Sequence, residues 1–305
     1  MEENRLLVLS GPTASGKTAL ALSLARIFPL EIVNADSLQV YRGMDIGTAK
    51  PALAERREVP HHLIDVADPD EEYNACRFVA GAEEAIRGIR ERGRFPLVSG
   101  GTGMYIRALL RGLDALPSDP SVRAALSLRW KEEGGAALFE ELRKVDPPSA
   151  AVIHPSDRIR VLRALEVAAL TGTPPSGLKR RWAEPGRKFR ILFIALSTER
   201  EVLYRRIDAR VDGMFLDGLV DEVKGLLSKG YGPDLKPMKS LGYRHVLYHL
   251  SGVFPLSRAI AETKRDTRRY AKRQATWLSR ETEAVRVEAE NAAVTAAALA
   301  KKFLF

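Results

Sequence analysis

The stretch LLVLSGPTASGKTALALSL, residues 6–24, decides the fold of this chain. Its apolar start, residues 6–9, predicts a buried strand, and residues 19–28 are good helix formers. Between them, residues 11–18 match the G-x-x-x-x-G-K-[ST] pattern of a phosphate-binding loop. A strand, this loop and a helix in that order predict a diphosphate-binding site. The pattern leaves open whether the diphosphate belongs to ATP, to GTP or to another molecule.

The loop carries the groups that a diphosphate needs. Glycines allow backbone N–H groups to point inward at phosphate oxygens, and the helix that follows contributes its positive N-terminus. Lys17 adds a point charge, and the hydroxyl of Thr18 can hold Mg²⁺. We therefore expect the diphosphate to contact Gly11, Thr13, Ala14, Ser15, Gly16, Lys17 and Thr18.

The composition is that of a globular protein. A chain of 305 residues with 45% apolar content can form one large domain or two modest ones. The N-terminal residues MEENRLL do not look like a signal peptide, and no apolar run approaches the length of a membrane span, so we expect a cytoplasmic protein. Cys76 is the single cysteine, which excludes an intramolecular disulfide, and we expect its thiol to be buried and inert.

The positive charge is concentrated in the last third of the chain. Residues 1–113 hold 14 basic and 15 acidic side chains, residues 114–186 hold 11 and 10, and residues 187–305 hold 23 and 14. The net charge of +9 therefore comes from the C-terminal part. Clustered Lys and Arg suggest a polyanionic partner, with nucleic acid as the first candidate and a basic solvated surface as the alternative.

The order of elements predicts an α/β fold, a P-loop NTPase-like parallel sheet with surrounding helices. Strands are expected at residues 6–9, 30–35, 94–98 and 189–196, and helices at 19–28, 75–92 and 104–110. The carboxyl ends of parallel strands meet at one edge of a sheet. We therefore expect the phosphate-binding loop, Asp36 and Thr102 to lie along that edge.

The middle of the chain is expected to form a separate helical insertion. Residues 114–186 contain many prolines and no clear strand, and their periodic pieces predict helices. Residues 1–113 and 187–305 would then form the core, with a long helix at 198–227 and a largely helical C-terminal part in which 260–280 is the most regular piece.

Two sites at the expected edge allow several readings. Asp36 could ligate Mg²⁺, cap the next helix or accept a proton from a substrate, and its position does not decide among these roles. The turn 99–102 could offer backbone N–H groups and the Thr102 hydroxyl to a leaving oxygen, or it could be an ordinary glycine turn.

Two further patterns are superficially suggestive. His61 and His62 look like a metal pair, but adjacent side chains usually point apart and no third ligand is evident, so we expect structural or supporting roles. Six cations recur at three- and four-residue steps on the C-terminal helix, which suits phosphates or a solvated face. They are Lys264, Arg265, Arg268, Arg269, Lys272 and Arg273.

Several short stretches, read in order after the phosphate-binding loop, resemble one family. They are DSLQ at 36–39, YRGMDIGTAKP at 41–51, PHHLID at 60–65, GGTGMY at 100–105, RALEV at 163–167, GY at 242–243 and TRRYAKRQATW at 267–277. Together they resemble the tRNA dimethylallyltransferases over nearly the whole chain. The lack of a zinc-finger extension resembles the bacterial form.

The resemblance implies an activity and a set of roles. A monomeric enzyme would transfer a dimethylallyl group from dimethylallyl diphosphate to N6 of the adenosine at tRNA position 37, next to the anticodon, and release diphosphate. Lys17, Thr18-bound Mg²⁺ and Arg210 would neutralise the leaving group. Asp36 would accept the N6 proton, and Thr102 would help to position the reacting groups.

The resemblance also implies which residues contact tRNA. In the expected core these are Asp36, Ser37, Leu38, Gln39 and Thr102. In the expected insertion they are Arg123, Ile159, Arg160, Val161, Leu162 and Arg163. The insertion is nearly neutral, so its share of the affinity for tRNA is an open point.

Three other functions remain as alternatives. A small-molecule kinase could use ATP at the same loop, but it leaves the basic C-terminal third unexplained. Isopentenyl transfer to free AMP or ADP would need neither the insertion nor the basic C-terminal part. A non-catalytic RNA-binding module would not need Asp36.

Overall fold

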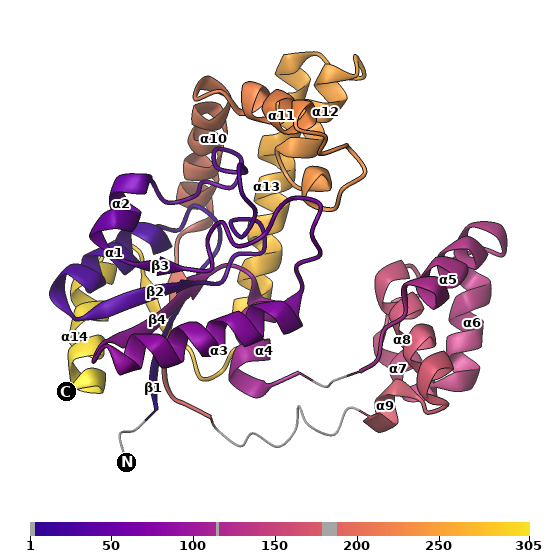
Figure 1. Cartoon of the computed structure of the whole chain (residues 1–305), viewed down its shortest axis with the longest axis horizontal. Helices are drawn as coiled ribbons and strands as arrows, with labels where there is room; N and C mark the ends of the chain where they lie inside the picture. Colours follow the sequence, from indigo (N-terminus) through magenta and orange to yellow (C-terminus); the bar gives the residue numbers. More distant parts are fainter. Residues whose placement is uncertain (1–3, 114–115, 179–187) are drawn as a thin grey trace. The chain divides into compact units, whose positions relative to one another are not determined.

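The computed structural model describes residues 4–113, 116–178 and 188–305 (Figure 1). The chain divides into two compact units. The first unit consists of Met1–Leu110 and Arg187–Phe305, and the second is Arg111–Gly186. The first unit is therefore built from two segments far apart in the sequence, between which the second unit is inserted.

The first unit is built on a six-stranded parallel sheet with the spatial order β3-β2-β4-β1-β5-β6. The strands are β1 (Arg5–Ser10), β2 (Leu30–Asn34), β3 (His61–His62), β4 (Phe95–Gly100), β5 (Arg190–Ser197) and β6 (Val285–Glu288). The expected α/β fold and its four strands are confirmed. The two strands that the sequence did not reveal, β3 and β6, are the short ones at the sheet edges.

Helices from both ends of the chain pack on the sheet. Leucines of α1 (Lys17–Ile27) and alanines of α14 (Ala292–Leu304) form one apolar core with the sheet residues Leu7, Ile32 and Ile194. The helix α3 (Ala75–Glu91) packs on β2 and β4 and also meets α4 (Gly103–Arg111). The two helices touch where Phe78 stacks on Tyr105 with ring centroids 4.6 Å apart.

The expectation of a buried Cys76 is wrong, because its side chain is exposed. The helix α3 begins after Asn74, whose side-chain oxygen caps the N–H of Arg77 at 3.1 Å. Its buried stripe runs through Ala75, Phe78, Ala82, Ile86 and Ile89, at steps of three and four residues. Residue 76 lies beside this stripe and faces solvent.

The expected long helix at 198–227 is in fact two helices, α10 (Arg200–Leu216) and α11 (Leu219–Ser228). The break falls at Gly218, whose φ of 100° lies in the left-handed region that glycine adopts without strain. The remaining elements of this part are η1 (Pro237–Lys239), α12 (Tyr243–Leu250) and α13 (Leu256–Leu278), while α2 (Leu53–Glu58) follows β2.

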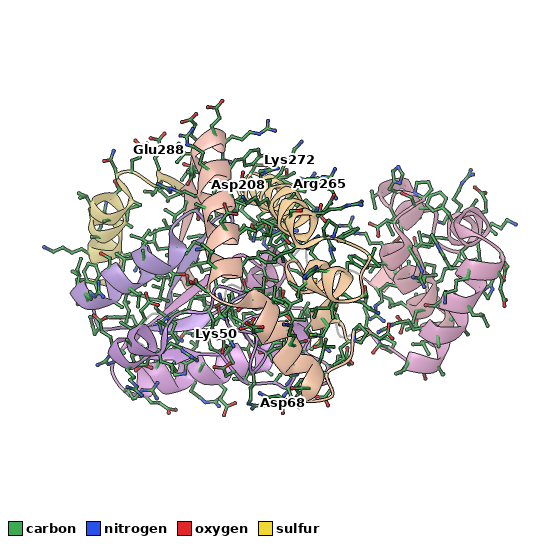
Figure 2. All side chains as sticks on the ribbon, turned by 90° about the horizontal axis from the view of Figure 1, so that it is seen from above. Lys50, Asp68, Asp208, Arg265, Lys272 and Glu288 are labelled. Atoms are coloured by element: carbon green, nitrogen blue, oxygen red, sulfur yellow. The ribbon has the colours of Figure 1, made fainter. Side chains whose placement is uncertain are left out.

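Ion pairs fasten α13 to α10. Arg268 contacts Asp208 at 2.6 Å, and Lys264 contacts Asp212 at 2.7 Å. Figure 2 shows Asp208 beside the stretch of α13 that carries Arg265 and Lys272. Part of the positive charge expected on this helix is therefore neutralised within the protein.

The second unit is a bundle of helices, as the sequence predicted. They are α5 (Pro120–Glu132), α6 (Gly135–Val145), α7 (Pro147–Val152), α8 (Arg158–Thr171) and α9 (Pro175–Leu178). Three of the prolines stand at the first position of a helix, where a missing N–H has no cost. The core of the unit includes Leu126, Leu138, Leu142, Val161 and Leu165.

The glycines after β4 are required by close packing. A Cβ at Gly100 would lie 2.2 Å from the backbone oxygen of Ala35, and one at Gly103 would lie 2.2 Å from the ring of Trp277 on α13. Both distances are far below van der Waals contact. The turn therefore brings the end of β2 and the helix α13 close to the same point.

We expect Gly100→Ala to lower the free energy of unfolding by about 1–3 kcal/mol, because the added methyl group forces backbone atoms apart. Gly225→Ala is the matched control, since nothing lies within 4 Å of its Cβ. That substitution should raise stability by about 0.5–1 kcal/mol, the usual gain for alanine within a helix. Urea denaturation measures both, and equal effects would contradict the packing argument.

Candidate active site

The phosphate-binding loop lies between β1 and α1 and is folded around its own lysine. The Lys17 Nζ donates to the carbonyl oxygens of Gly11 and Pro12, each at 2.8 Å. Ala14 and Gly16 have φ values of 63° and 96°. Burial lowers the pKa of Lys17 to about 8, which Asp36 opposes and Arg210 reinforces. The loop therefore holds a desolvated cation at the N-terminus of a helix, an arrangement that favours a bound anion.

Two adjacent hollows meet at this loop. The inner cavity, of about 90 Å³, is lined by Lys17, Thr18 and the ends of β2 and β4. The outer cleft, of about 710 Å³, extends over α4, α10 and α13. Six residues line both and form the wall between them: Thr13, Asp36, Thr48, Ala49, Arg210 and Tyr270. A ligand in one hollow is therefore next to a ligand in the other.

Asp36 caps a turn rather than the helix that the sequence suggested, and its roles toward Mg²⁺ or a substrate proton stay predictions. Its Oδ1 accepts the N–H groups of Leu38 at 2.9 Å and Gln39 at 3.3 Å, so it caps the turn that follows β2. Its Oδ2 accepts no hydrogen bond from the described residues. Since Asp36 lines both hollows, this second oxygen is available to a proton or to a cation.

Thr102 lies next to Asp36, as the topology predicted. Its Oγ1 accepts the N–H of Ser37 at 3.1 Å, and its own N–H donates to the carbonyl oxygen of Ala35 at 3.2 Å. The Thr102 N–H is therefore not free for a substrate oxygen, contrary to one reading of the glycine turn. The hydroxyl remains at the lining of the outer cleft.

Two residues of α13 that the sequence did not reveal lie at this site: Tyr270 belongs to the wall, and Gln274 lines the inner cavity. The Gln274 Oε1 accepts the N–H of Thr13 at 2.8 Å, and its Nε2 donates to the Gly101 oxygen at 3.0 Å. Tyr270 lies near Gln274 and Thr102, and burial raises its pKa to about 12, so the phenol stays protonated. The detectable signal was a glutamine on the buried stripe of a helix, where a polar side chain needs hydrogen-bond partners.

Arg210 comes from α10 and reaches both hollows. It makes no ion pair or hydrogen bond with any residue that the structure describes. The protein around it desolvates the guanidinium and lowers its pKa, although the residue stays open to solvent through the cleft. A cation without a protein carboxylate, close to Lys17, is suited to an anionic ligand.

The residues around the loop fit Mg²⁺ only in company with a ligand. The Thr18 hydroxyl and the Asp36 carboxylate both line the inner cavity. Within the described parts of the chain, no group of three or more His, Cys, Asp or Glu could hold a metal by itself. Mg²⁺ commonly takes one or two protein oxygens together with phosphate and water. The role of Thr18 as a magnesium ligand stays a prediction.

The two histidines point apart, as expected for neighbours on a strand. His62 contacts Glu31 at 2.7 Å, while the ring nitrogen Nδ1 of His61 lies 2.7 Å from the carbonyl oxygen of Val59. His61 lines the inner cavity, and burial lowers its pKa. These contacts give both residues supporting roles.

The residues after Asp36 differ in what they can contact. Ser37 and Leu38 line the outer cleft, where a large ligand could touch them. Gln39 lines the inner cavity instead, and its side-chain amide donates to the carbonyl oxygens of Thr48 at 3.1 Å and Ala49 at 3.2 Å. The position of Gln39 therefore does not support its expected contact with tRNA, because its side chain is bound to two backbone groups of the wall.

The second unit shows which of its expected RNA-contacting residues are accessible. Ile159 is 81% exposed, and Arg160 is also at the surface. Val161 and Leu162 are packed in the core of the unit, so their side chains are corrected to a structural role. Contact of Ile159 and Arg160 with tRNA stays a prediction.

Arg123 and Arg163 both pair with one buried carboxylate. Their guanidinium groups lie 3.1 Å and 2.8 Å from the oxygens of Glu166, whose side chain is 1% exposed. Burial opposes ionisation of Glu166, but the two arginines and the N–H of Asp119 hold its pKa below the usual value. These arginines stabilise the unit, and their contact with tRNA stays a prediction.

Of the six cations that the sequence placed on α13, two make no ion pair with the residues that the structure describes. They are Lys272 and Arg273. Arg273 lines the outer cleft, as does Arg269, whose guanidinium lies 3.4 Å from Asp266. The positive charge available to an external polyanion is thus smaller than the sequence count, and part of it borders the cleft.

A phosphate-binding loop at the carboxyl edge of a parallel sheet, opening into a larger cleft, defines a protein of the P-loop fold class that brings an anion beside a second ligand. Residues 39–281 match the family model described as IPP transferase, and residues 4–65 match isopentenyl transferase. The chain belongs to the IPP transferase family.

Relatives and solved structures agree with this. The tRNA dimethylallyltransferase of Geobacter metallireducens is 50% identical over 94% of this chain and 93% of its own length. That of Syntrophobacter fumaroxidans is 53% identical over 89% and 80%. The tRNA isopentenylpyrophosphate transferase of Bacillus halodurans superposes with a TM-score of 0.74 at 37% identity, over 99% and 97% of the two chains. A eukaryotic dimethylallyltransferase acting on tRNA superposes with a TM-score of 0.83 at 30% sequence identity, over 99% of this chain and 80% of the other.

Because Lys17 has a pKa of about 8, we expect inorganic diphosphate to bind more weakly at pH 9 than at pH 7, as the ammonium loses its proton. Lys17→Arg keeps its positive charge over this range. Calorimetry measures the affinity for diphosphate at both pH values in both proteins, and so separates the effect of deprotonating Lys17 from the titration of diphosphate itself. The same pH dependence in both would contradict the assignment to Lys17.

Proposed function

We propose that this protein transfers a dimethylallyl group from dimethylallyl diphosphate to N6 of the adenosine at position 37 of tRNA, releasing diphosphate. The observation that carries the proposal is the shared wall, where Asp36 and Arg210 face both hollows. A diphosphate in the inner cavity and a purine in the outer cleft would meet at this wall. The family to which the chain belongs supports the same pairing of substrates.

The donor side of the reaction demands stabilisation of a departing anion. When the allylic C–O bond breaks, its electron pair goes to the diphosphate, and positive charge spreads over the allylic carbons. Lys17 and Arg210 supply two preorganised cations close to that oxygen. Mg²⁺, when bound at Thr18, would neutralise further charge on the same leaving group.

The acceptor side demands removal of a proton. The exocyclic amine of adenine is a poor nucleophile, and it must lose a proton as the C–N bond forms. The Oδ2 of Asp36 is not engaged by the described residues, while Oδ1 is held by two backbone N–H groups. This arrangement supports Asp36 as the proton acceptor, and Thr102 holds the adjoining turn through Ser37.

A base stacked in an anticodon arm cannot reach this wall. The adenine must be extruded into the outer cleft, and the cost of unstacking is met by contacts with the loop and its phosphates. Ser37, Leu38 and the cations of α13 border that cleft, which suits a nucleic acid. Free AMP would need far less of this surface.

The proposal includes a monomeric, cytoplasmic enzyme. No helix within the described residues has the length and apolar character needed to cross a membrane. Size-exclusion chromatography with light scattering tests the monomer.

We expect Asp36→Asn to lower turnover by about 10²- to 10⁴-fold, the range for loss of a general base. Asparagine keeps a side-chain oxygen for the N–H groups of Leu38 and Gln39, so the turn should survive and tRNA should still bind. Nucleoside analysis of tRNA incubated with donor and Mg²⁺ measures the product, and gel shift measures binding. Unchanged turnover would remove Asp36 from its role.

We expect binding of an anticodon stem-loop to weaken steeply between 50 and 200 mM salt, by about 10²-fold or more, because lysines and arginines displace counterions from phosphates. Fluorescence anisotropy with a labelled stem-loop measures the slope. AMP serves as the control ligand. A flat response with the stem-loop would favour the mononucleotide acceptor instead.

A further inference from the structure

The loop after β2 supplies the part of the wall that no catalytic residue occupies. Residues 48 and 49 line both hollows, and Gly47 lines the outer cleft. The segment has neither helix nor strand, and Ala49 has a φ of 49°, in the region that alanine rarely adopts. Such a segment keeps its shape only if other parts of the protein hold it.

A single carboxylate holds this loop from outside. Glu222 on α11 accepts the N–H groups of Asp45 at 2.9 Å, Ile46 at 2.7 Å and Gly47 at 3.1 Å. It also accepts the hydroxyl of Tyr243 at 2.6 Å. Consecutive backbone N–H groups that converge in this way form an anion-binding concavity, and here the anion is a side chain of the same protein.

The contact on the other side is steric. Tyr243 is fully buried, and a Cβ at Gly47 would lie 2.5 Å from its ring. The loop backbone is therefore pressed against the aromatic ring that Glu222 also fixes. From within the site, Gln39 binds the carbonyl oxygens of residues 48 and 49. Residues 45–49 are thus held on one side by Gln39 and on the other side by Glu222 and Tyr243.

Glu222 itself lines neither the inner cavity nor the outer cleft, so it acts on the reaction only through the loop. We propose that Glu222 is a positioning residue that keeps residues 45–49 closed over the donor and thereby excludes water from the allylic carbon. This inference rests on the proposed function, because it concerns the fate of the same donor.

The chemistry gives closure a measurable consequence. Once the allylic C–O bond breaks and its electron pair leaves with the diphosphate, the carbon is attacked by the nearest nucleophile. Attack by N6 gives prenylated tRNA. Attack by water forms a new C–O bond, releases a proton to the solvent and gives a C5 allylic alcohol. A loosened wall should shift the ratio of these products toward the alcohol.

The test measures both products from labelled dimethylallyl diphosphate with saturating stem-loop. For Glu222→Gln, whose amide nitrogen cannot accept an N–H, we expect the ratio of prenylated RNA to alcohol to fall by about tenfold. Glu222→Asp, which keeps the charge, should recover part of the ratio. Tyr243→Phe leaves the three N–H bonds in place and should have a smaller effect.

Asp221→Asn is the matched control on the same helix, since Asp221 is 81% exposed and pairs only with Lys224 at the surface. Its product ratio should equal that of the natural enzyme. A Glu222→Gln enzyme that turns over more slowly with an unchanged ratio would overturn the proposal, because a general loss of folded protein lowers both products alike. Failure of the natural enzyme to prenylate the stem-loop would instead refute the proposed function.

Discussion

The two hydrogen bonds of the Gln274 side chain are the interaction on which the rest of the site depends. They join Thr13 of the phosphate-binding loop to Gly101 of the turn after β4, and both partners lie far from Gln274 in the sequence. The amide can make both bonds because its oxygen accepts a hydrogen bond from one backbone group while its nitrogen donates to the other. The helix α13 is thereby fixed against the phosphate-binding loop and the turn after β4.

The position of α13 determines the two hollows. Its Tyr270 closes the wall beside Asp36, its Arg269 and Arg273 border the outer cleft, and its Trp277 packs on Gly103. The glycines of the turn are needed because the helix comes so close. A sheet and loop shared by many phosphate-binding proteins therefore become a two-substrate site through one added helix, while ion pairs to α10 keep that helix in place.

The sequence predicted the parts of the site that depend on local pattern. The loop at 11–18, the four central strands and the convergence of Asp36 with Thr102 follow from apolar periodicity and from the rule for parallel sheets. Contacts between distant segments could not be predicted in this way. Gln274 and Glu222 act on backbone groups more than 170 residues away, and neither carries a local signal of its partner.

Local sequence pattern gave wrong predictions where a single residue decides between a buried and an exposed side chain, or between one helix and two. Cys76 is exposed because the buried stripe of α3 passes beside it, and the helix expected at 198–227 breaks at a single glycine. The family resemblance, rather than local pattern, placed Val161 and Leu162 against tRNA together with their exposed neighbours, but their side chains are packed in the core of the second unit. Whether such a segment faces a partner or a core depends on the rotation of one helix.

The most direct test of the central claim is a crystal structure of the protein with an unreactive allylic diphosphate analogue, Mg²⁺ and an anticodon stem-loop. We expect the diphosphate in the inner cavity on Lys17 and Arg210, and an extruded adenine in the outer cleft with N6 within hydrogen-bond reach of the Asp36 Oδ2. A diphosphate bound outside the loop, or an adenine whose N6 points away from the shared wall, would contradict it.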